Sequence, residues 1–212
     1  MNTYIEHTIL KADTSKQEII TLCAEAKDNN FIGVCIAPYF IKTAKKELKN
    51  TEVKVVTVVG FPLGYSATPA KIEEVKRAID DGADEIDMVM NIAALKEKDY
   101  SYVSNDIESL TTLVHMKGAK IKVILETALL TQEEKIIALE LCEAAKVDFV
   151  KTSTGFSSGG ATLEDIKLMR KTLNSQIKIK ASGGIKTKEQ AEALIAAGAD
   201  RIGTSSGIKL MK

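Results

Sequence analysis

The sequence predicts an α/β protein that folds as a single closed (β/α)8 TIM barrel. Eight short segments rich in valine and isoleucine alternate with longer segments that carry charge along one face, as strands and helices do in a barrel of parallel strands. Polar residues end the last three of these strands, where barrels place their functional sites. An open, doubly wound sheet is the alternative, but no Gly-x-Gly-x-x-Gly follows the first strand, as it does in dinucleotide-binding sheets.

One domain that covers residues 1–212 is expected. The chain has 212 residues, of which 45% are hydrophobic, and this is enough to bury one sizeable core. Each predicted strand is a short run that contains β-branched residues. In chain order, the predicted strands are Tyr4–Leu10, Ile32–Ala37, Val53–Val59, Glu85–Val89, Ile121–Glu126, Asp148–Thr152, Ile177–Ala181 and Arg201–Thr204.

Between the strands lie longer amphipathic segments that predict helices. Thr131 and Glu134 have the spacing of a capping box, and Asp13 and Thr187 are further N-cap candidates. The predicted helices are Ser15–Asn29, Ile41–Leu48, Thr68–Asp81, Tyr100–Lys117, Thr131–Ala145, Thr162–Leu173 and Lys188–Ala197.

Two of these helices are predicted to end in the same way. Asp81-Gly82-Ala83-Asp84 and Ala197-Gly198-Ala199-Asp200 each separate a helix from a strand, and glycine suits the left-handed conformation that closes many helices. Ala145-Lys146-Val147-Asp148 takes the matching place without a glycine. The recurrence indicates a repeated helix-to-strand unit.

The charge balance argues against two classes of partner. Lysine plus arginine and aspartate plus glutamate both number 29, so a nucleic acid or an anionic membrane is not an expected partner. No apolar run approaches the length of about 20 residues that spans a membrane. The first residues lack the basic and apolar pattern of a secretory signal.

The cysteines and histidines argue for a cytoplasmic protein without a metal. Cys23, Cys35 and Cys142 are odd in number and far apart, as expected of reduced thiols. His7 and His115 are too few for most imidazole-based metal sites, and no Cys-x-x-Cys pair is present. No metal ion and no other cofactor is therefore expected.

The turns after the last two predicted strands are rich in glycine and serine. They read Ser182-Gly183-Gly184 and Thr204-Ser205-Ser206-Gly207. In barrels these two loops commonly bind a phosphate through backbone N–H groups, and glycine lets the backbone approach it closely. Ordinary turns are the alternative, but two such loops at the two expected places favour a phosphate site.

Two lysines end neighbouring predicted strands. Lys151 ends the sixth strand and Lys180 lies near the end of the seventh. Two ammonium groups in one pocket repel each other, which favours the neutral, nucleophilic form of one of them. Lys178 shares a face with Lys180 but lies deeper, which favours a structural role. A paired structural lysine or an anion-binding cation is the alternative for both strand-end lysines.

Asp87 is predicted to point into the barrel, since Ile86 and Met88 take the helix-facing side of its strand. A carboxylate between two lysines balances their charge, shuttles a proton, or does both. Lys122 and Glu126 share one face of the next strand. An internal ion pair between them is expected, and the alternative is that they extend the inner polar network around Asp87.

The roles of three further side chains stay open at this level. Cys35 either lines the pocket or packs as a core thiol. His7 can face inward or outward, while His115, late in an amphipathic helix, is expected on the surface.

Seven motifs along the chain together match one known family. Lys-Thr-Ser-Thr-Gly at 151–155 combined with Lys-x-x-Gly-Gly at 180–184 is highly specific, although neither half is so alone. On these motifs the chain resembles the deoxyribose-phosphate aldolases over essentially its whole length. The motifs are Ile5–Lys11, Val34–Pro38, Val59–Gly64, Glu85–Val89, Phe149–Phe156, Lys180–Ile185 and Gly203–Ser206.

The resemblance implies a class I, metal-free aldolase on a (β/α)8 barrel. Such an enzyme reversibly cleaves 2-deoxy-D-ribose 5-phosphate to D-glyceraldehyde 3-phosphate and acetaldehyde. By the matched motifs, Lys151 would form the Schiff base, Lys180 would favour its neutral form and relay protons, and Asp87 would assist proton transfer. The implied phosphate-binding residues are Gly155, Gly183, Gly184, Ser205 and Ser206.

The chain departs from the family pattern at two places. Family members commonly have aspartate where this chain has Glu6, and the longer side chain is expected to move a hydroxyl-binding contact. Some members end in a tyrosine that reaches the site, whereas this chain ends in Lys209-Leu210-Met211-Lys212. The resemblance therefore implies the same reaction but leaves its rate and the tail-dependent proton step open.

Three other functions compete with this interpretation. They are a transaldolase-like Schiff-base enzyme, a phosphosugar isomerase that forms no imine, and a phosphosugar-binding protein without catalysis. The sequence also leaves open whether the chain is a monomer or a homo-oligomer (dimer or tetramer), and how strictly the 5-phosphate is required.

Overall fold

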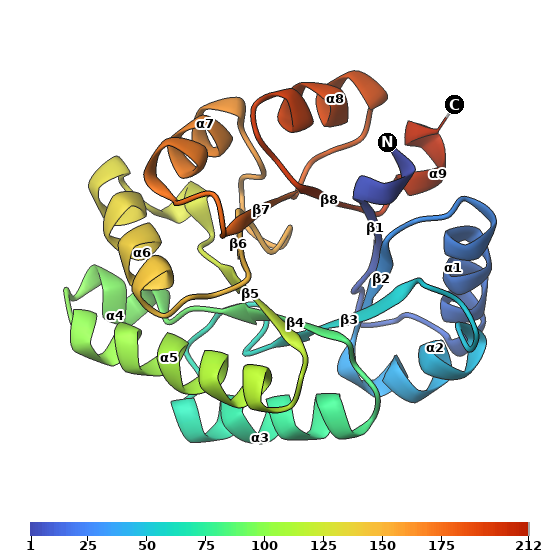
Figure 1. Ribbon diagram of the computed structural model, residues 1–212, viewed down its shortest axis with the longest axis horizontal. Coiled ribbons are helices and arrows are strands. Elements are labelled where there is room, and N and C mark those ends of the chain that lie inside the picture. Colours follow the sequence, from blue (N-terminus) through green and yellow to red (C-terminus); the bar gives the residue numbers. More distant parts are fainter. Residues whose placement is uncertain (212) are drawn as a thin grey trace.

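The computed structural model describes residues 1–211, whose eight parallel strands close into one barrel in sequential order. Figure 1 shows the strands at the centre and the helices around them. The barrel closes where β8 pairs with β1, at Ile5 with Ile202. This confirms the predicted fold class. The strands are β1 (Ile5–Ile9), β2 (Gly33–Ile36), β3 (Lys54–Val59), β4 (Glu85–Val89), β5 (Lys120–Ile124), β6 (Phe149–Lys151), β7 (Lys178–Ser182) and β8 (Arg201–Thr204).

All seven predicted helices are present, and their ends lie within one residue of the predicted ones. Thr131 and Thr187 are N-caps with capping boxes, but Ser15, not Asp13, caps the first helix because its side chain accepts the N–H of Glu18. The seven are α1 (Lys16–Asp28), α2 (Ile41–Glu47), α3 (Thr68–Asp80), α5 (Tyr100–Met116), α6 (Gln132–Ala144), α7 (Leu163–Thr172) and α8 (Lys188–Ala196).

The sequence did not predict the shortest elements. They hold three to five residues each, too few to show a helical repeat of apolar residues. They are the helices α4 (Ile92–Lys96) and α9 (Gly207–Leu210) and the 3₁₀ turns η1 (Asn2–Tyr4), η2 (Pro38–Phe40) and η3 (Thr127–Leu129).

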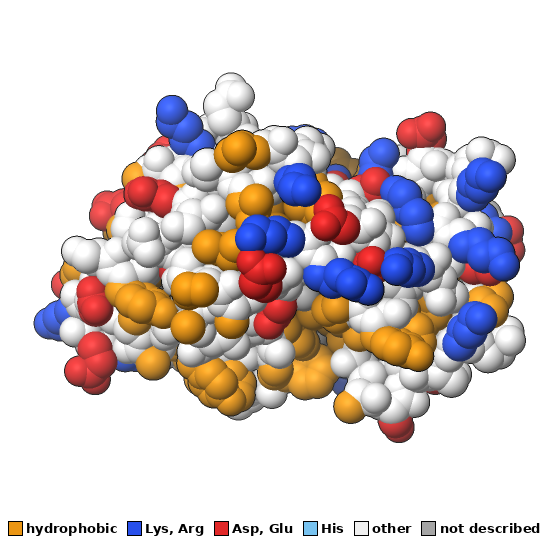
Figure 2. Space-filling view, turned by 90° about the horizontal axis from the view of Figure 1, so that it is seen from below, with side chains coloured by type: hydrophobic (Ala, Val, Ile, Leu, Met, Phe, Trp, Pro, Cys, Tyr) orange, Lys and Arg blue, Asp and Glu red, His pale blue; other side chains and the backbone are white. Residues whose placement is uncertain are grey.

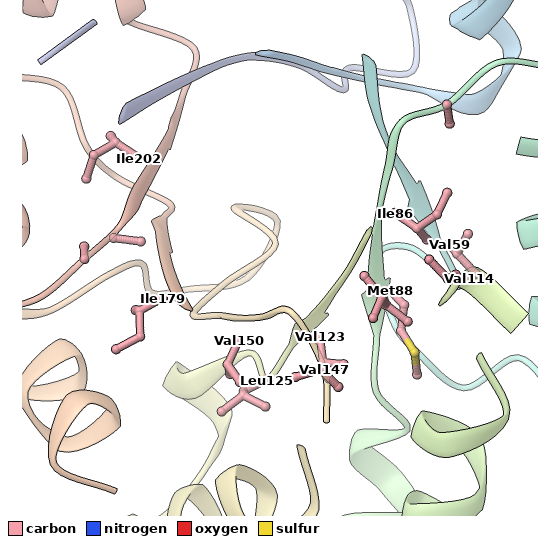
Figure 3. Packing of buried hydrophobic residues seen from close by; sticks show 14 of the residues in the cluster. Val59, Ile86, Met88, Val114, Val123, Leu125, Val147, Val150, Ile179 and Ile202 are labelled. Carbon is pink, nitrogen blue, oxygen red and sulfur yellow. The ribbon is translucent and has the colours of Figure 1, made fainter. Parts of the chain in front are cut away.

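The main hydrophobic core lies between the barrel and its helices. Figure 3 shows part of it, in which Ile86 and Met88 of β4 and Val114 of α5 belong to one buried cluster. Inside the barrel, Cys35, Val56 and Val58 form a separate small apolar cluster. Most other strands contribute charged residues to the interior, which is unlike the usual branched apolar filling of such barrels. The interior of the barrel is therefore largely ionic.

The repeated helix-to-strand unit has one geometry at all three places. Gly82 and Gly198 have φ of 111° and 116°, which confirms the predicted left-handed ends. Lys146 has φ of 56° at the matching place, and its N–H donates to the Glu143 carbonyl at 3.0 Å, as in a Schellman motif. The aspartate that follows each of them accepts a backbone N–H from a neighbouring strand. These pairs are Val55 with Asp84 (2.8 Å), Ile121 with Asp148 (2.9 Å) and Ile179 with Asp200 (2.8 Å).

We expect Lys146→Gly to stabilise the fold by about 0.5–1 kcal/mol. The left-handed conformation costs an L-residue about 1–2 kcal/mol, and the greater entropy of glycine in the unfolded chain offsets part of the gain. Urea unfolding of the two proteins measures the difference. As the matched control, Gly82→Ala should destabilise, because its Cβ would lie 3.1 Å from Lys45 Cγ at φ of 111°. Lower stability of Lys146→Gly would contradict this account.

The outer surface carries interspersed charges. Figure 2 looks onto the side covered by α3 and shows basic and acidic side chains next to one another. At the end of α3, Arg77 Nε lies 2.9 Å from Oδ2 of Asp81, the residue that follows the helix. Among residues 1–211, no helix is long and apolar enough to cross a membrane.

Candidate active site

Lys151, Lys180 and Asp87 meet inside the barrel. Lys151 and Lys180 are direct neighbours in the register of β6 and β7, while Asp87 comes from β4. Asp87 Oδ2 accepts hydrogen bonds from Lys151 Nζ at 2.8 Å and from Lys180 Nζ at 2.7 Å. All three residues are buried. Both lysines that the sequence singled out for chemistry thus contact Asp87, and their ammonium groups share one carboxylate oxygen.

The charges of this group hold one another in place. Burial disfavours ionised Asp87, but Lys122, Lys151 and Lys180 outweigh this and hold the pKa of its carboxyl well below the usual range. Burial likewise disfavours charged Lys180, but Asp87 and Glu6 outweigh it and raise its pKa. Lys180 is therefore a firmly protonated ammonium group beside Lys151.

A second layer of charges lies beneath. Lys122 Nζ contacts Asp87 Oδ1 at 2.9 Å and Glu85 Oε2 at 2.6 Å. Arg201 lies 2.9 Å from Glu6 Oε1 and 3.3 Å from Glu85 Oε2. Glu6 in turn pairs with Lys180. These contacts join the two layers into one closed ring of buried ion pairs.

The expected ion pair between Lys122 and Glu126 is wrong. Lys122 belongs to the ring, but Glu126 accepts hydrogen bonds from the hydroxyl and the N–H of Thr154. The reason is that β5 ends at Ile124 and the chain turns at Glu126, which has φ of 56°. The alternation of strand faces therefore stops before Glu126.

Sequence reasoning missed the part played by Arg201 and Glu85. Arg201 opens β8 and stacks on Phe149, with its guanidinium carbon 5.0 Å from the ring centre. The available signal was the alternation of β8, which places Arg201 on the same face as Gly203, the side that faces Lys180. Lys178, expected to have a structural role, is exposed at the start of β7 with its Nζ 5.9 Å from the same ring.

A cavity of about 290 Å³ opens above the lysines. Of the residues predicted for the site, Lys151, Gly155, Gly183, Gly184 and Ser205 line it. Lys180 and Asp87 lie beneath it. Ser206 lines a neighbouring groove instead, because its N–H turns back to the Thr204 hydroxyl at 2.9 Å. Ser182, from the predicted phosphate loop, also lines it, and the lining residues that were not predicted for the site include Thr8, Leu10, Lys11, Phe156 and Lys186.

The glycine-rich loops after β6 and β7 pack backbone against backbone. A Cβ on Gly160 would lie only 2.2 Å from the carbonyl oxygen of Gly183. Gly155, Gly183 and Gly184 have φ of 84°, 88° and 75°, a conformation that disfavours other residues. Ser182 Oγ donates to the Ser153 carbonyl at 2.6 Å and ties the loops together. The cavity wall on this side is therefore bare backbone, which suits close approach of an anion.

Another part of the cavity wall is aromatic. Phe156, which is half-exposed, meets Phe61 edge to face with ring centres 5.2 Å apart. The two rings come from the loops after β6 and β3. The site therefore joins a polar wall to an aromatic one.

The structure shows where Cys35, His7 and His115 lie, which the sequence left open or only predicted. Cys35 is fully buried, and burial raises the pKa of its thiol, so it is a packed core thiol. His7 faces outward, with Nε2 2.8 Å from Glu25 and its ring edge-on to Phe31. His115 is on the surface, as expected, where Nε2 lies 2.9 Å from Asp148.

Among the described residues, three side chains of the kinds that bind metal ions lie close together inside the barrel. Oxygen and sulfur atoms of Glu6, Cys35 and Asp87 come within 4.8 Å of one another. Both carboxylates already contact lysine ammonium groups, which supply the positive charge that a cation would bring. This donor set serves ion pairing.

Comparison with known proteins identifies the family of this chain. Residues 2–211 match the family model described as DeoC/LacD family aldolase. The deoxyribose-phosphate aldolase of Thermococcus kodakarensis is 56% identical over 211 residues, which cover 99% of this chain and 94% of that protein.

Two solved structures are similar to this chain. A proposed deoxyribose-phosphate aldolase from Coccidioides immitis has a TM-score of 0.95 and 42% identity, over 99% of this chain and 83% of its own. Deoxyribose phosphate aldolase from Aeropyrum pernix, described as a unique tetramer, has a TM-score of 0.92 and 28% identity, over 99% of this chain and 88% of its own. Since a family model matches nearly the whole chain and a full-length relative is 56% identical, the chain belongs to the DeoC/LacD family of aldolases.

Proposed function

We propose that this protein is a class I aldolase that reversibly cleaves 2-deoxy-D-ribose 5-phosphate to D-glyceraldehyde 3-phosphate and acetaldehyde. One observation carries the proposal. The buried amine of Lys151 contacts Asp87, which also binds Lys180, and Lys151 lines a cavity. The name of the Thermococcus relative, deoxyribose-phosphate aldolase, supports the choice of substrate.

The reaction needs an electron sink next to the bond that breaks. Neutral Lys151 Nζ adds to C1 of the open-chain sugar, and loss of water from the carbinolamine leaves a protonated imine. Removal of the C3 hydroxyl proton then breaks the C2–C3 bond, whose electron pair becomes the C1–C2 double bond of an enamine. C3 leaves as the aldehyde carbon of glyceraldehyde 3-phosphate. Protonation at C2 and addition of water release acetaldehyde and restore the lysine.

Asp87 and Lys180 would move the protons of these steps. Asp87 Oδ2 lies 2.8 Å from the reacting nitrogen, within reach for proton transfer in the carbinolamine and enamine stages. Lys180 shares that oxygen and is held protonated, so it can return a proton while disfavouring a second charge on Lys151. Both residues lie beneath the cavity and act from below the imine.

The substrate's phosphate would lie against the glycine loops. Gly155, Gly183, Gly184 and Ser205 line the cavity, and Lys11 and Lys186 add positive charge there. Ser206 is proposed to act through the shape of its loop, since it lines the neighbouring groove.

We expect Gly183→Ala to raise KM for 2-deoxyribose 5-phosphate about tenfold or more, with a smaller change in kcat. At φ of 88°, the new Cβ would lie 3.0 Å from Gly160 Cα and push the loops apart. Steady-state kinetics with and without the 5-phosphate measures the effect, and unphosphorylated 2-deoxyribose should lose little kcat/KM. Gly118→Ala is the matched control, because Gly118 also has a left-handed φ but has no atoms nearby. Equal losses with both substrates would contradict a phosphate site.

The function itself is tested by borohydride reduction in the presence of 2-deoxyribose 5-phosphate, followed by peptide mass mapping. A reduced adduct on Lys151 is expected. A folded, substrate-bound protein without an adduct would overturn the aldolase and favour an isomerase or a binding protein. Transfer of the enamine to a second sugar in preference to glyceraldehyde 3-phosphate would favour the transaldolase-like alternative.

The domain organisation, the location and the oligomeric state of the protein are proposed as follows. Residues 1–212 are proposed as one catalytic domain, since all eight strands belong to one barrel; Lys212 lies outside the described residues. The cytoplasm is proposed as its location, since the three cysteines are buried free thiols. A homo-oligomer is proposed from the tetramer of the Aeropyrum relative. Light scattering in solution tests this, and the mass of a monomer would contradict it.

A further inference from the structure

We propose that Arg201 and Glu85, two residues at the far side of the buried charge ring, tune the protonation of Lys151 by setting the ring's net charge. The inference rests on the proposed function, in which neutral Lys151 is the nucleophile. Neither residue lines the cavity or contacts Lys151 among the described residues, so both would be positioning residues that act through others.

The ring carries an excess of one positive charge when every member is ionised. Within residues 1–211, its contacts join four cationic side chains to three carboxylates. Loss of one proton from one lysine makes the whole buried group neutral, which is the state that a poorly hydrated interior favours. The members are Lys122, Lys151, Lys180 and Arg201 with Glu6, Glu85 and Asp87.

The contacts indicate that this lysine is Lys151. Lys122 contacts three carboxylates, and Lys180 contacts two. Among residues 1–211, Lys151 contacts one carboxylate, that of Asp87, and it shares the contacted oxygen with Lys180. In agreement, carboxylates outweigh burial and raise the pKa of Lys122, Lys180 and Arg201. Among the described residues, Lys151 is therefore the cation of the ring with the fewest carboxylate partners.

Other groups around Lys151 do not change this balance. Cys35 on β2 stays a neutral thiol, because burial raises its pKa. Glu126, after β5, is engaged by Thr154 outside the ring. Lys11 and Lys186 line the cavity but are exposed, so solvent screens them. The inner side of β3 contributes the apolar Val56 and Val58. Lys54, on the same face, lies at the start of the strand with its side chain 42% exposed, so solvent screens it.

Arg201 and Glu85 reach Lys151 through two short paths. Arg201 contacts Glu6, which contacts Lys180, the direct neighbour of Lys151 on Asp87. Glu85 contacts Lys122, which binds the other oxygen of Asp87. Most of these groups are withdrawn from water, so their charges are poorly screened and act over several ångströms.

The test is the pH dependence of kcat/KM for 2-deoxyribose 5-phosphate in Arg201→Gln and Glu85→Gln. Activity rises with pH as Lys151 loses its proton. Arg201→Gln removes a positive charge, so Lys151 keeps its proton longer and the midpoint of the rise should move to higher pH. Glu85→Gln removes a negative charge, so the midpoint should move to lower pH. Each shift should be on the order of half to one pH unit. The substrate titrates identically in every assay, so differences belong to the protein.

Two further variants separate charge from structure. Arg201→Lys keeps the positive charge at this position, so its midpoint should lie near that of the unmodified protein. The double variant Arg201→Gln/Glu85→Gln restores the original net charge of the ring, so its midpoint should also return toward that of the unmodified protein. Shifts of both single variants in the same direction, or no shift in either folded variant, would overturn the inference. Borohydride trapping on the unmodified protein tests the aldolase function independently of these pH profiles. If an adduct formed on Lys151 but the two single variants did not shift the midpoint in opposite directions, the proposed aldolase function would stand. Only the proposed role of Arg201 and Glu85 would be lost.

Discussion

Lys151→Arg should lower kcat for 2-deoxyribose 5-phosphate cleavage by on the order of 10⁴-fold or more. Arginine keeps the positive charge opposite Asp87, but its guanidinium stays protonated and does not form an imine with an aldehyde. The ring of ion pairs should therefore survive, and the loss should lie in kcat. A coupled assay for glyceraldehyde 3-phosphate measures the rate, and borohydride trapping should leave no adduct.

Lys178→Arg is the matched control for this variant. Lys178 lies on the neighbouring strand but is exposed at its start and contacts no member of the ring among the described residues. Its replacement should leave kcat within about twofold, since exposed substitutions rarely disturb a fold. A folded Lys151→Arg protein that kept a tenth of the activity would rule out imine formation at Lys151.

Asp87→Asn should both destabilise the protein and slow the reaction. The change leaves Lys122, Lys151 and Lys180 with one carboxylate fewer in a buried site. Breaking a buried ion pair by removing one partner typically costs about 3–5 kcal/mol. Loss of a group that transfers protons typically costs a further factor of about 10²–10⁴ in kcat. Urea unfolding and steady-state kinetics measure the two effects separately.

A second change distinguishes proton transfer from charge balance. Adding Lys122→Met to Asp87→Asn removes one cation and restores the original net charge of the ring. We expect the double variant to recover much of the lost stability without recovering kcat. If kcat returned together with stability, Asp87 would serve only to balance the lysines. That result would assign proton transfer to Lys180 or to water.

The fold was largely predictable because it depends on local patterns. Alternating short β-branched runs and amphipathic segments located every strand to within two residues and every long helix to within one. Gly82 and Gly198 marked helix ends because few other residues adopt a left-handed conformation cheaply. The elements that were missed, such as α4 and α9, are too short to show a period.

The chemistry-bearing residues were also visible in the sequence, since the two lysines lie in strands that lead into polar turns and Asp87 lies on the inward face of an alternating strand. Lys151, Lys180 and Asp87 were selected in this way, and the barrel brings them into contact. Among the phosphate-site candidates, only Ser206 lies outside the cavity. Its N–H bonds to the Thr204 hydroxyl, a local turn that composition does not reveal.

Only the tertiary structure decided which charges pair. Glu6 reaches Lys180 and Arg201, partners 174 and 195 positions away, because barrel closure sets β1 against β8. Lys122 pairs with Asp87 and not with Glu126, because β5 ends at Ile124, between Lys122 and Glu126. Residue types and strand ends follow from local sequence, whereas the partners of a buried ion depend on how distant strands are brought into register.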